Sequence, residues 1–149
     1  MVKRLEVRDH TEISAPHAIV WKLLTENPYI SEYMHECEIQ SDWQVGGSVL
    51  WKNKNDRSII LKGILVQLEL QKLLHYSVFD PHLCDYADVP TNYSDVTIAV
   101  DDIHGSTLLS VVHGGFEHIV NGGALFKQET DRWHFTLSRI KQLAENFQE

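Results

Sequence analysis

The sequence predicts an α+β fold in which one long C-terminal helix packs against a curved antiparallel sheet of six to seven strands. Two observations point to this fold class. Short segments of alternating apolar and polar residues follow one another with short turns between them, which is typical of antiparallel strands. The end of the chain, from Leu125 to Phe147, repeats apolar residues at helical spacing. The 149 residues contain no linker and no repeat, so we expect one domain over 1–149.

The chain is expected to open with a strand and two short helices. In residues 3–14 apolar residues alternate with charged ones, which predicts the strand. Ser14 stands in the position of an N-cap, and Pro16 suits the first turn of the helix that follows. Asn27-Pro28 ends this helix, and a second short helix is expected at about 28–34.

Six further strands are expected between these helices and the C-terminal one. Their predicted ranges are 37–41, 48–53, 58–70, 73–80, 93–101 and 106–113. Residues 54–57 have the composition of a hairpin turn, and Gly105 lies where the turn between the last two strands suits a positive φ. In the fourth of these strands, Leu74, Tyr76 and Val78 fall on one face.

Composition and charge narrow the classes of partner. The chain has 21 acidic and 13 basic residues, a net charge of −8 and no basic patch, so nucleic acid and anionic membrane surfaces are not expected partners. No apolar run approaches the roughly 18 residues that a membrane span needs. The first residues lack the apolar core of a secretory signal. Cys37 and Cys84 are expected to be reduced thiols, so a cytoplasmic location is expected.

Five short motifs occur along nearly the whole chain in a characteristic order. They are Ile13-Ser14-Ala15-Pro16 through Trp21, Asp42-Trp43-Gln44-Val45-Gly46-Gly47, Gly63 through Leu73-Leu74-His75-Tyr76, Thr107-Leu108 through His113-Gly114-Gly115-Phe116, and Trp133 followed by Leu137 and Leu143. Together they resemble the START/Bet v 1-like (SRPBCC) superfamily, and in particular its branch related to the C-terminal domain of the activator of Hsp90 ATPase (AHSA1-like).

This resemblance implies a helix-grip fold, in which a strongly curved antiparallel sheet wraps around the C-terminal helix and encloses a hydrophobic cavity. Members of the superfamily include lipid carriers, binders of plant hormones and flavonoids, aromatic cyclases and solo bacterial domains. The resemblance therefore predicts the fold better than the function.

Ten residues are candidates for the lining of such a cavity. They are Trp21, Trp43, Trp51, Tyr76, Val78, His113, Phe116, Phe126, Trp133 and Leu137. We expect Phe126, Trp133 and Leu137 to form the floor and His113 to lie near the rim. Large aromatic side chains usually fill a core, and each of these can do so instead. Tyr76 also carries a hydroxyl that needs a partner if it is buried, and a ligand can supply one.

The other candidate residues have ordinary structural interpretations. The motif from Asp42 to Gly47 is interpreted mainly as a turn, with glycines at unusual backbone angles and Asp42 bonded to nearby N–H groups. For His113, a hydrogen bond to the backbone at the end of a strand is favoured over a role in orienting a ligand or in acid–base chemistry. Glu69 and Asp80 are expected to be exposed at strand ends.

No residue pattern requires a metal, a cofactor or a catalytic group. The nine histidines are scattered, and the nearest approach to a ligand set, His82-Leu83-Cys84-Asp85, is not predicted to bind a metal. We therefore expect a protein that binds a small hydrophobic molecule, lipid-like or polyketide-like. The alternatives are a cyclase or hydrolase that uses the same cavity, and a chaperone-related interaction module. A homodimer is a further candidate assembly. Stimulation of Hsp90 is not expected, because the chain has no room for the second domain of the two-domain activator.

Overall fold

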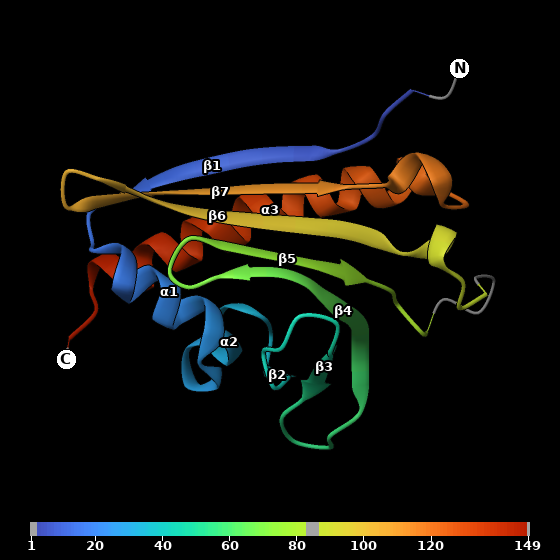
Figure 1. Cartoon of the computed structure of the whole chain (residues 1–149), viewed down its shortest axis with the longest axis horizontal. Coiled ribbons are helices and arrows are strands. Elements are labelled where there is room, and N and C mark those ends of the chain that lie inside the picture. Colours follow the sequence, from blue (N-terminus) through green and yellow to red (C-terminus); the bar gives the residue numbers. More distant parts are fainter. Residues whose placement is uncertain (1–2, 83–86, 149) are drawn as a thin grey trace.

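The computed structural model describes residues 3–82 and 87–148, in which the strands form one antiparallel sheet and the last helix runs alongside it (Figure 1). The elements in chain order are β1 (Val7–Ile13), α1 (His17–Thr25), α2 (Asn27–Tyr33), β2 (Cys37–Gln40), β3 (Ser48–Asn53), β4 (Ile59–Glu69), β5 (Leu73–Val78), η1 (Pro90–Asn92), β6 (Ser94–Ile103), β7 (Ser106–Gly114), η2 (Phe116–His118) and α3 (Gly122–Glu145).

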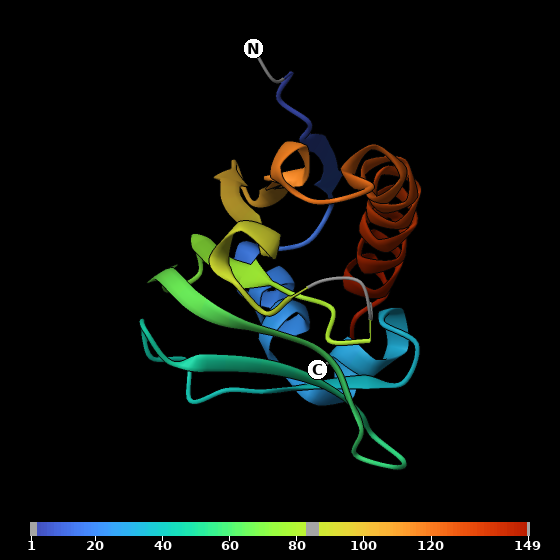
Figure 2. The ribbon, with the colours of Figure 1, turned by 90° about the vertical axis from the view of Figure 1, so that its right-hand side faces the viewer.

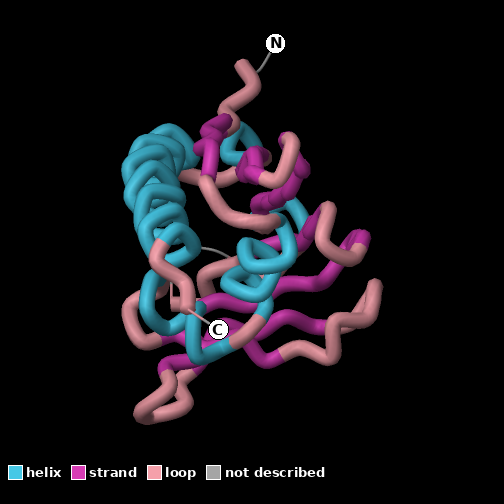
Figure 3. Tube along the Cα trace, turned by 90° about the vertical axis from the view of Figure 1, so that its left-hand side faces the viewer, coloured by secondary structure: helices cyan, strands magenta, loops and turns pink. Residues whose placement is uncertain are grey.

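The sheet has the strand order β1-β7-β6-β5-β4-β3-β2, and all of its pairings are antiparallel. Strands β2 to β7 therefore follow one another as a meander, and β1 joins the far side of β7. The view along the strands in Figure 2 shows the sheet curving from β1, beside α3, round to β2 and β3. Figure 3 views the molecule from the end opposite to that in Figure 2, where α1 and α2 lie between α3 and the strands. The predicted helix-grip architecture is confirmed.

A sharp bend in β4 produces much of this curvature, and Gly63 permits it. The first half of β4 pairs with β3 and the second half with β5, with a bulge between Leu65 and Gln67. A Cβ atom on Gly63 would lie 1.7 Å from the backbone oxygen of Ser77. No side chain fits there, so glycine alone allows the two strands to approach this closely. Figure 1 shows β4 turning through this bend.

The start of α1 differs from the prediction that Ser14 caps it. Pro16 is the N-cap residue, with an extended backbone (ψ 148°), and no side chain caps the helix. The backbone N–H of Ser14 instead donates to a carboxylate oxygen of Glu145, 2.8 Å away near the end of α3. Ser14 therefore helps to fix the chain between β1 and α1 against the last helix.

The turn between β6 and β7 was predicted correctly. His104 (φ 51°) and Gly105 (φ 92°) both have positive φ, as a two-residue hairpin loop with the twist of its strands requires. The turn before β3 also has the predicted chemistry. Asp42 accepts a hydrogen bond from the backbone N–H of Gln44, and Gly46 has a φ of 89°.

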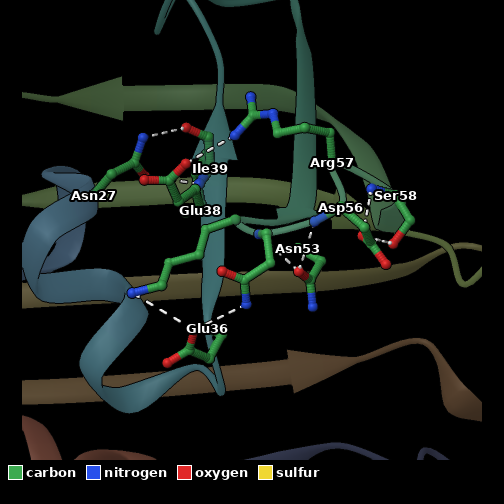
Figure 4. A network of polar contacts seen from close by, with 10 residues as sticks. Asn27, Glu36, Glu38, Ile39, Asn53, Asp56, Arg57 and Ser58 are labelled. Carbon is green, nitrogen blue, oxygen red and sulfur yellow. Dashed lines mark hydrogen bonds and ion pairs between the residues drawn. The ribbon is translucent and has the colours of Figure 1, made fainter.

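Asn27, the first residue of α2, holds this helix against β2. Its side-chain amide donates to the backbone oxygen of Ile39 (3.0 Å) and accepts from the backbone N–H of the same residue (2.7 Å). Figure 4 shows this pair beside the turn between β3 and β4, where Arg57 reaches Glu38 at 2.8 Å. Exposed ion pairs of this kind add at most about 1 kcal/mol, so the amide clamp is the firmer attachment.

Candidate ligand-binding pocket

An apolar pocket of about 250 Å³ lies between the concave face of the sheet and α3, with part of its wall from α1 and α2. Its aliphatic wall consists of Leu24, Ile39, Val49, Leu61, Leu74, Val78, Val96, Ile98, Ile119, Leu125 and Ile140. The sheet turns every second side chain of a strand to its concave face, and these side chains form most of the wall. The volume lies below the roughly 300–1,000 Å³ of pockets for drug-sized molecules, so the space suits a small ligand.

Seven of the ten residues predicted to line the cavity lie in this wall. They are Trp43, Trp51, Tyr76, Val78, His113, Phe116 and Trp133. The side chains of Leu74, Tyr76 and Val78 share the concave face of β5, as the alternation in the sequence predicted. Trp43 lies in the turn before β3 and is half-buried against the core, so one residue serves both the turn and the pocket.

Trp21, Phe126 and Leu137 are not part of the lining. Trp21 and Leu137 are buried in the core, with 7% and 3% of their surface exposed. Phe126 packs edge-on against Phe116, with the ring centroids 6.3 Å apart. For Phe126 and Leu137, which both lie on α3, the rotation of this helix about its axis explains why they do not form the expected floor. Successive helix residues are about 100° apart, and a stripe adjacent to theirs faces the pocket.

The stripe of α3 that faces the pocket contains polar residues that the sequence analysis did not single out. It consists of Leu125, Gln128, Glu129, Arg132, Trp133, Thr136 and Ile140. Their spacing of three or four residues is the signal that could have found them. Asp80, expected to be exposed at a strand end, also lines the pocket and is half-buried.

His113 is held by side chains on two sides, and the expected hydrogen bond to the backbone is wrong. Its Nδ1 accepts a hydrogen bond from Nε1–H of Trp133 on α3, at 2.9 Å. Because indole nitrogen only donates, Nδ1 must carry the lone pair, and the ring proton then lies on Nε2. Nε2 is 2.8 Å from Oγ of Ser94, to which it donates. The histidine therefore links β7, β6 and α3.

The His113 ring is neutral in the folded protein. Only 3% of the residue is exposed, and burial lowers its pKa from 6.5 to about 3, with a smaller contribution from the positive charge of Arg132. A carboxylate oxygen of Glu129 lies 3.6 Å from Nδ1. This contact is not an ion pair, because Nδ1 is unprotonated, and the same carboxylate oxygen is engaged by Arg132.

Glu129 and Arg132 form an ion pair at the pocket wall. Nε and a terminal nitrogen of Arg132 lie 2.6 and 2.5 Å from the same Glu129 oxygen. The guanidinium group also lies over the ring of Trp133, 4.7 Å from its centroid. The pair is about a third or less exposed, with Arg132 at 35% and Glu129 at 22%.

Tyr76 is a polar residue on the opposite wall, on β5. Its ring lies 5.2 Å from that of Trp51, tilted by 52°. Burial raises the pKa of the Tyr76 hydroxyl above its ordinary value; the positive charge of Arg132 opposes this shift and the negative charge of Glu129 adds to it. The hydroxyl therefore stays protonated near neutral pH and can donate a hydrogen bond.

The described part of the chain contains neither a cluster of metal ligands nor a helix that could span a membrane. In residues 3–82 and 87–148 no three His, Cys, Asp or Glu side chains gather as metal ligands would. Three residues of the His82-Leu83-Cys84-Asp85 segment lie outside the described residues. Across the same ranges, no helix combines the length and the apolar character that crossing a membrane requires.

Comparison with known proteins gives one family and many similar structures. The family described as activator of Hsp90 ATPase homolog 1-like protein matches residues 14–145. ChR145 of Cytophaga hutchinsonii is similar over 98% of this chain and 97% of its own, with 29% identity and a TM-score of 0.77. No curated protein matches the chain.

Two more distant structures are similar in fold. The Aha1 protein of Colwellia psychrerythraea, solved as a dimer, has 12% identity and a TM-score of 0.72 over 95% of this chain and 96% of its own. DynU16, a protein in the dynemicin biosynthetic locus, has 16% identity and a TM-score of 0.71 over 95% of this chain and 48% of its own. At such identities the likeness shows the fold alone.

Proposed function

Because the chain belongs to the family of activator of Hsp90 ATPase homolog 1-like proteins, whose fold can enclose a cavity, we propose that its pocket binds a small hydrophobic or aromatic molecule. The observation that carries the proposal is the apolar space between the sheet and α3, with walls that include Trp43, Trp51, Phe116 and Trp133. Aromatic walls offer large contact areas to a flat ligand.

Filling the pocket tests this proposal. In Val78→Trp, a large ring would occupy space between β5 and α3, whereas Val66→Trp places the same ring on β4 at a residue that is 44% exposed. We expect at least one member of a panel of lipids, flavonoids and aromatic polyketides to raise the melting temperature and to shift NMR signals of pocket residues in the wild-type protein. Val78→Trp should weaken this binding by at least about tenfold and Val66→Trp should not. Binding that survives equally in both folded variants, or no binding by the wild type, would refute the proposal.

An enzyme that uses the same pocket is the alternative, and the state of His113 argues against it. Both ring nitrogens are engaged, by Trp133 and by Ser94, and the pKa of about 3 leaves the ring a weak base. If a cyclase or hydrolase activity is found, His113→Asn and Tyr76→Phe will show whether either residue takes part. Turnover that disappears in both variants, with binding retained, would favour catalysis over binding alone.

Contact with an Hsp90-type chaperone is a second candidate, suggested by the family description. Three apolar residues are exposed at the bend of β4 and in the turn before β3, which pairs with it: Val45 (63%), Ile64 (49%) and Val66 (44%). Such a patch suits a protein contact. Purified Hsp90 retained by the wild type and released by Ile64→Asp would support this candidate, and no retention by the wild type would count against it.

A further inference from the structure

Three polar residues of the pocket lie on two facing elements and interact electrostatically. Tyr76 lies on β5, while Glu129 and Arg132 are one turn apart on α3, and all three line the pocket. Both α3 charges act on the Tyr76 hydroxyl. These three residues form a polar region of the pocket, to which both of its walls contribute.

The Tyr76 hydroxyl has unused hydrogen-bonding capacity. Among residues 3–82 and 87–148 no side chain or backbone group forms a hydrogen bond with it, yet no fully enclosed polar side-chain atom there lacks a partner. The hydroxyl must therefore keep some accessible surface, and Tyr76 is half-buried in the pocket wall. A phenol in this position usually finds a partner. A molecule that enters the pocket can supply this hydrogen-bond partner.

The Glu129–Arg132 pair also has an unused hydrogen-bond acceptor. The contacts of Glu129 with Arg132 and with His113 all use the same carboxylate oxygen, Oε2. Across the described part of the chain the other oxygen, Oε1, has no such contact, so it remains an acceptor. The polar region thus offers a donor from Tyr76 and an acceptor from Glu129.

We infer that the ligand of this pocket is a small flat apolar molecule with an uncharged hydroxyl group, such as a phenol, placed between Tyr76 and Glu129. The ligand hydroxyl accepts a hydrogen bond from Tyr76 and donates one to the free carboxylate oxygen of Glu129. A hydroxyl group is the smallest group that satisfies both at once. This inference rests on the proposed binding function and specifies its ligand class.

The charge of the pocket favours a neutral ligand over an anionic one. Arg132 is already paired with Glu129, and Asp80 adds a further carboxylate to the wall. An anionic ligand would meet a wall with one more negative than positive side chain, in a chain of net charge −8. Moving a carboxylate from water into this apolar space without a free cation is costly.

Three ligands that share one ring system test the inference: naphthalene, 2-naphthol and 2-naphthoate, titrated into the full chain at pH 7 and followed by NMR. We expect 2-naphthol to bind the wild type about 3- to 10-fold more tightly than naphthalene, as one or two net hydrogen bonds predict, and 2-naphthoate to bind more weakly than 2-naphthol. In Tyr76→Phe the preference for 2-naphthol over naphthalene should fall about 2- to 10-fold, because the hydrogen bond from Tyr76 is lost while the one to Glu129 remains, and naphthalene should still bind.

The matched control is Tyr29→Phe. Tyr29 packs against Phe147 and does not line the pocket, so this variant should keep the wild-type preference. Equal binding of naphthalene and 2-naphthol, tighter binding of 2-naphthoate than of 2-naphthol, or a preference that is undiminished in Tyr76→Phe would each overturn the inference and leave the proposed function standing. If none of the three ligands binds the wild type, the inference fails, and the proposed function is then decided by the separate panel of lipids, flavonoids and aromatic polyketides.

Discussion

Replacing His113 by asparagine perturbs the buried hydrogen bonds that join the sheet to α3. The amide oxygen of asparagine can accept from Trp133 as Nδ1 does, but the shorter side chain loses the 2.8 Å contact with Ser94. One buried polar group then lacks its partner, so we expect the free energy of unfolding at pH 7 to fall by about 1–3 kcal/mol.

The pH dependence of this variant tests the reasoning more sharply. The pKa of His113 is 6.5 ordinarily and about 3 in the folded protein, so between these values the unfolded chain binds a proton that the folded one does not. The contribution of the neutral ring to stability is complete above about pH 6.5 and is lost progressively as the pH falls toward 3. Linkage gives a loss of about 2 kcal/mol between pH 7 and pH 5. Asparagine does not titrate, so its deficit relative to the wild type should shrink by that amount at pH 5.

Urea unfolding, followed by tryptophan fluorescence at pH 7, 6 and 5, measures these free energies. His134→Asn is the control, since that side chain is 80% exposed. The other titratable groups are common to the three proteins, so most of their effect cancels in the differences. If the wild type and His113→Asn lose the same stability between pH 7 and pH 5, His113 is not a neutral buried ring in the folded state, and the assignment of its partners is wrong.

Two further substitutions test the shape of the sheet and the attachment of α2. Gly63→Ala should destabilise the fold by about 3 kcal/mol or more, because the added Cβ would lie 1.7 Å from the backbone oxygen of Ser77. The control is Gly123→Ala, whose added Cβ would have no atom within 4 Å and should stabilise α3 by about 0.5–1 kcal/mol. Urea midpoints compare the two, and a neutral Gly63→Ala would mean that β4 does not need its close approach to β5. Asn27→Ala removes both hydrogen bonds to Ile39 and should cost about 1–3 kcal/mol. Unchanged amide exchange at Ile39 in that variant would contradict the clamp.

Alternation along the strands allowed the sheet side of the pocket to be predicted from sequence. A strand turns every second side chain to the same face, so the placement of Leu74, Tyr76 and Val78 on one wall follows from their spacing alone. The turn at Gly105 was equally local, because two-residue hairpins need positive φ. Strand faces and hairpin turns depend only on residues close together in the sequence, and these features could be predicted from it.

The helical side of the pocket depends on contacts that spacing cannot supply. Phe126 and Leu137 are as large and apolar as the true lining residues, and the rotation of α3 about its axis decides which of them face the space. That rotation follows from packing against β1, more than 100 residues earlier in the chain. Glu129 and Arg132 were overlooked because charged residues are ordinarily solvated, and their pairing is what permits them in the wall.

Ser14 and His113 show the same limit for single polar groups. The N–H of Ser14 is paired with Glu145, 131 positions away, and the ring of His113 is paired with a tryptophan on another element. A sequence identifies a group that needs a partner, whereas only the assembled fold determines which distant group supplies it.

The pairing of β1 with β7 also bears on how the chain folds. Val7 faces His113 and Ile13 faces Thr107 in this ladder, so the first strand can be paired only after the strand next to the last helix has been made. Closing so long a loop lowers the entropy of the chain before the contacts of the ladder form. Domains dominated by pairings between residues far apart in sequence fold in milliseconds to seconds. On the ribosome, β1 must stay unpaired from β7 until residues 106–114 have emerged. The wall of the pocket that α3 supplies is therefore among the last parts of the molecule to form.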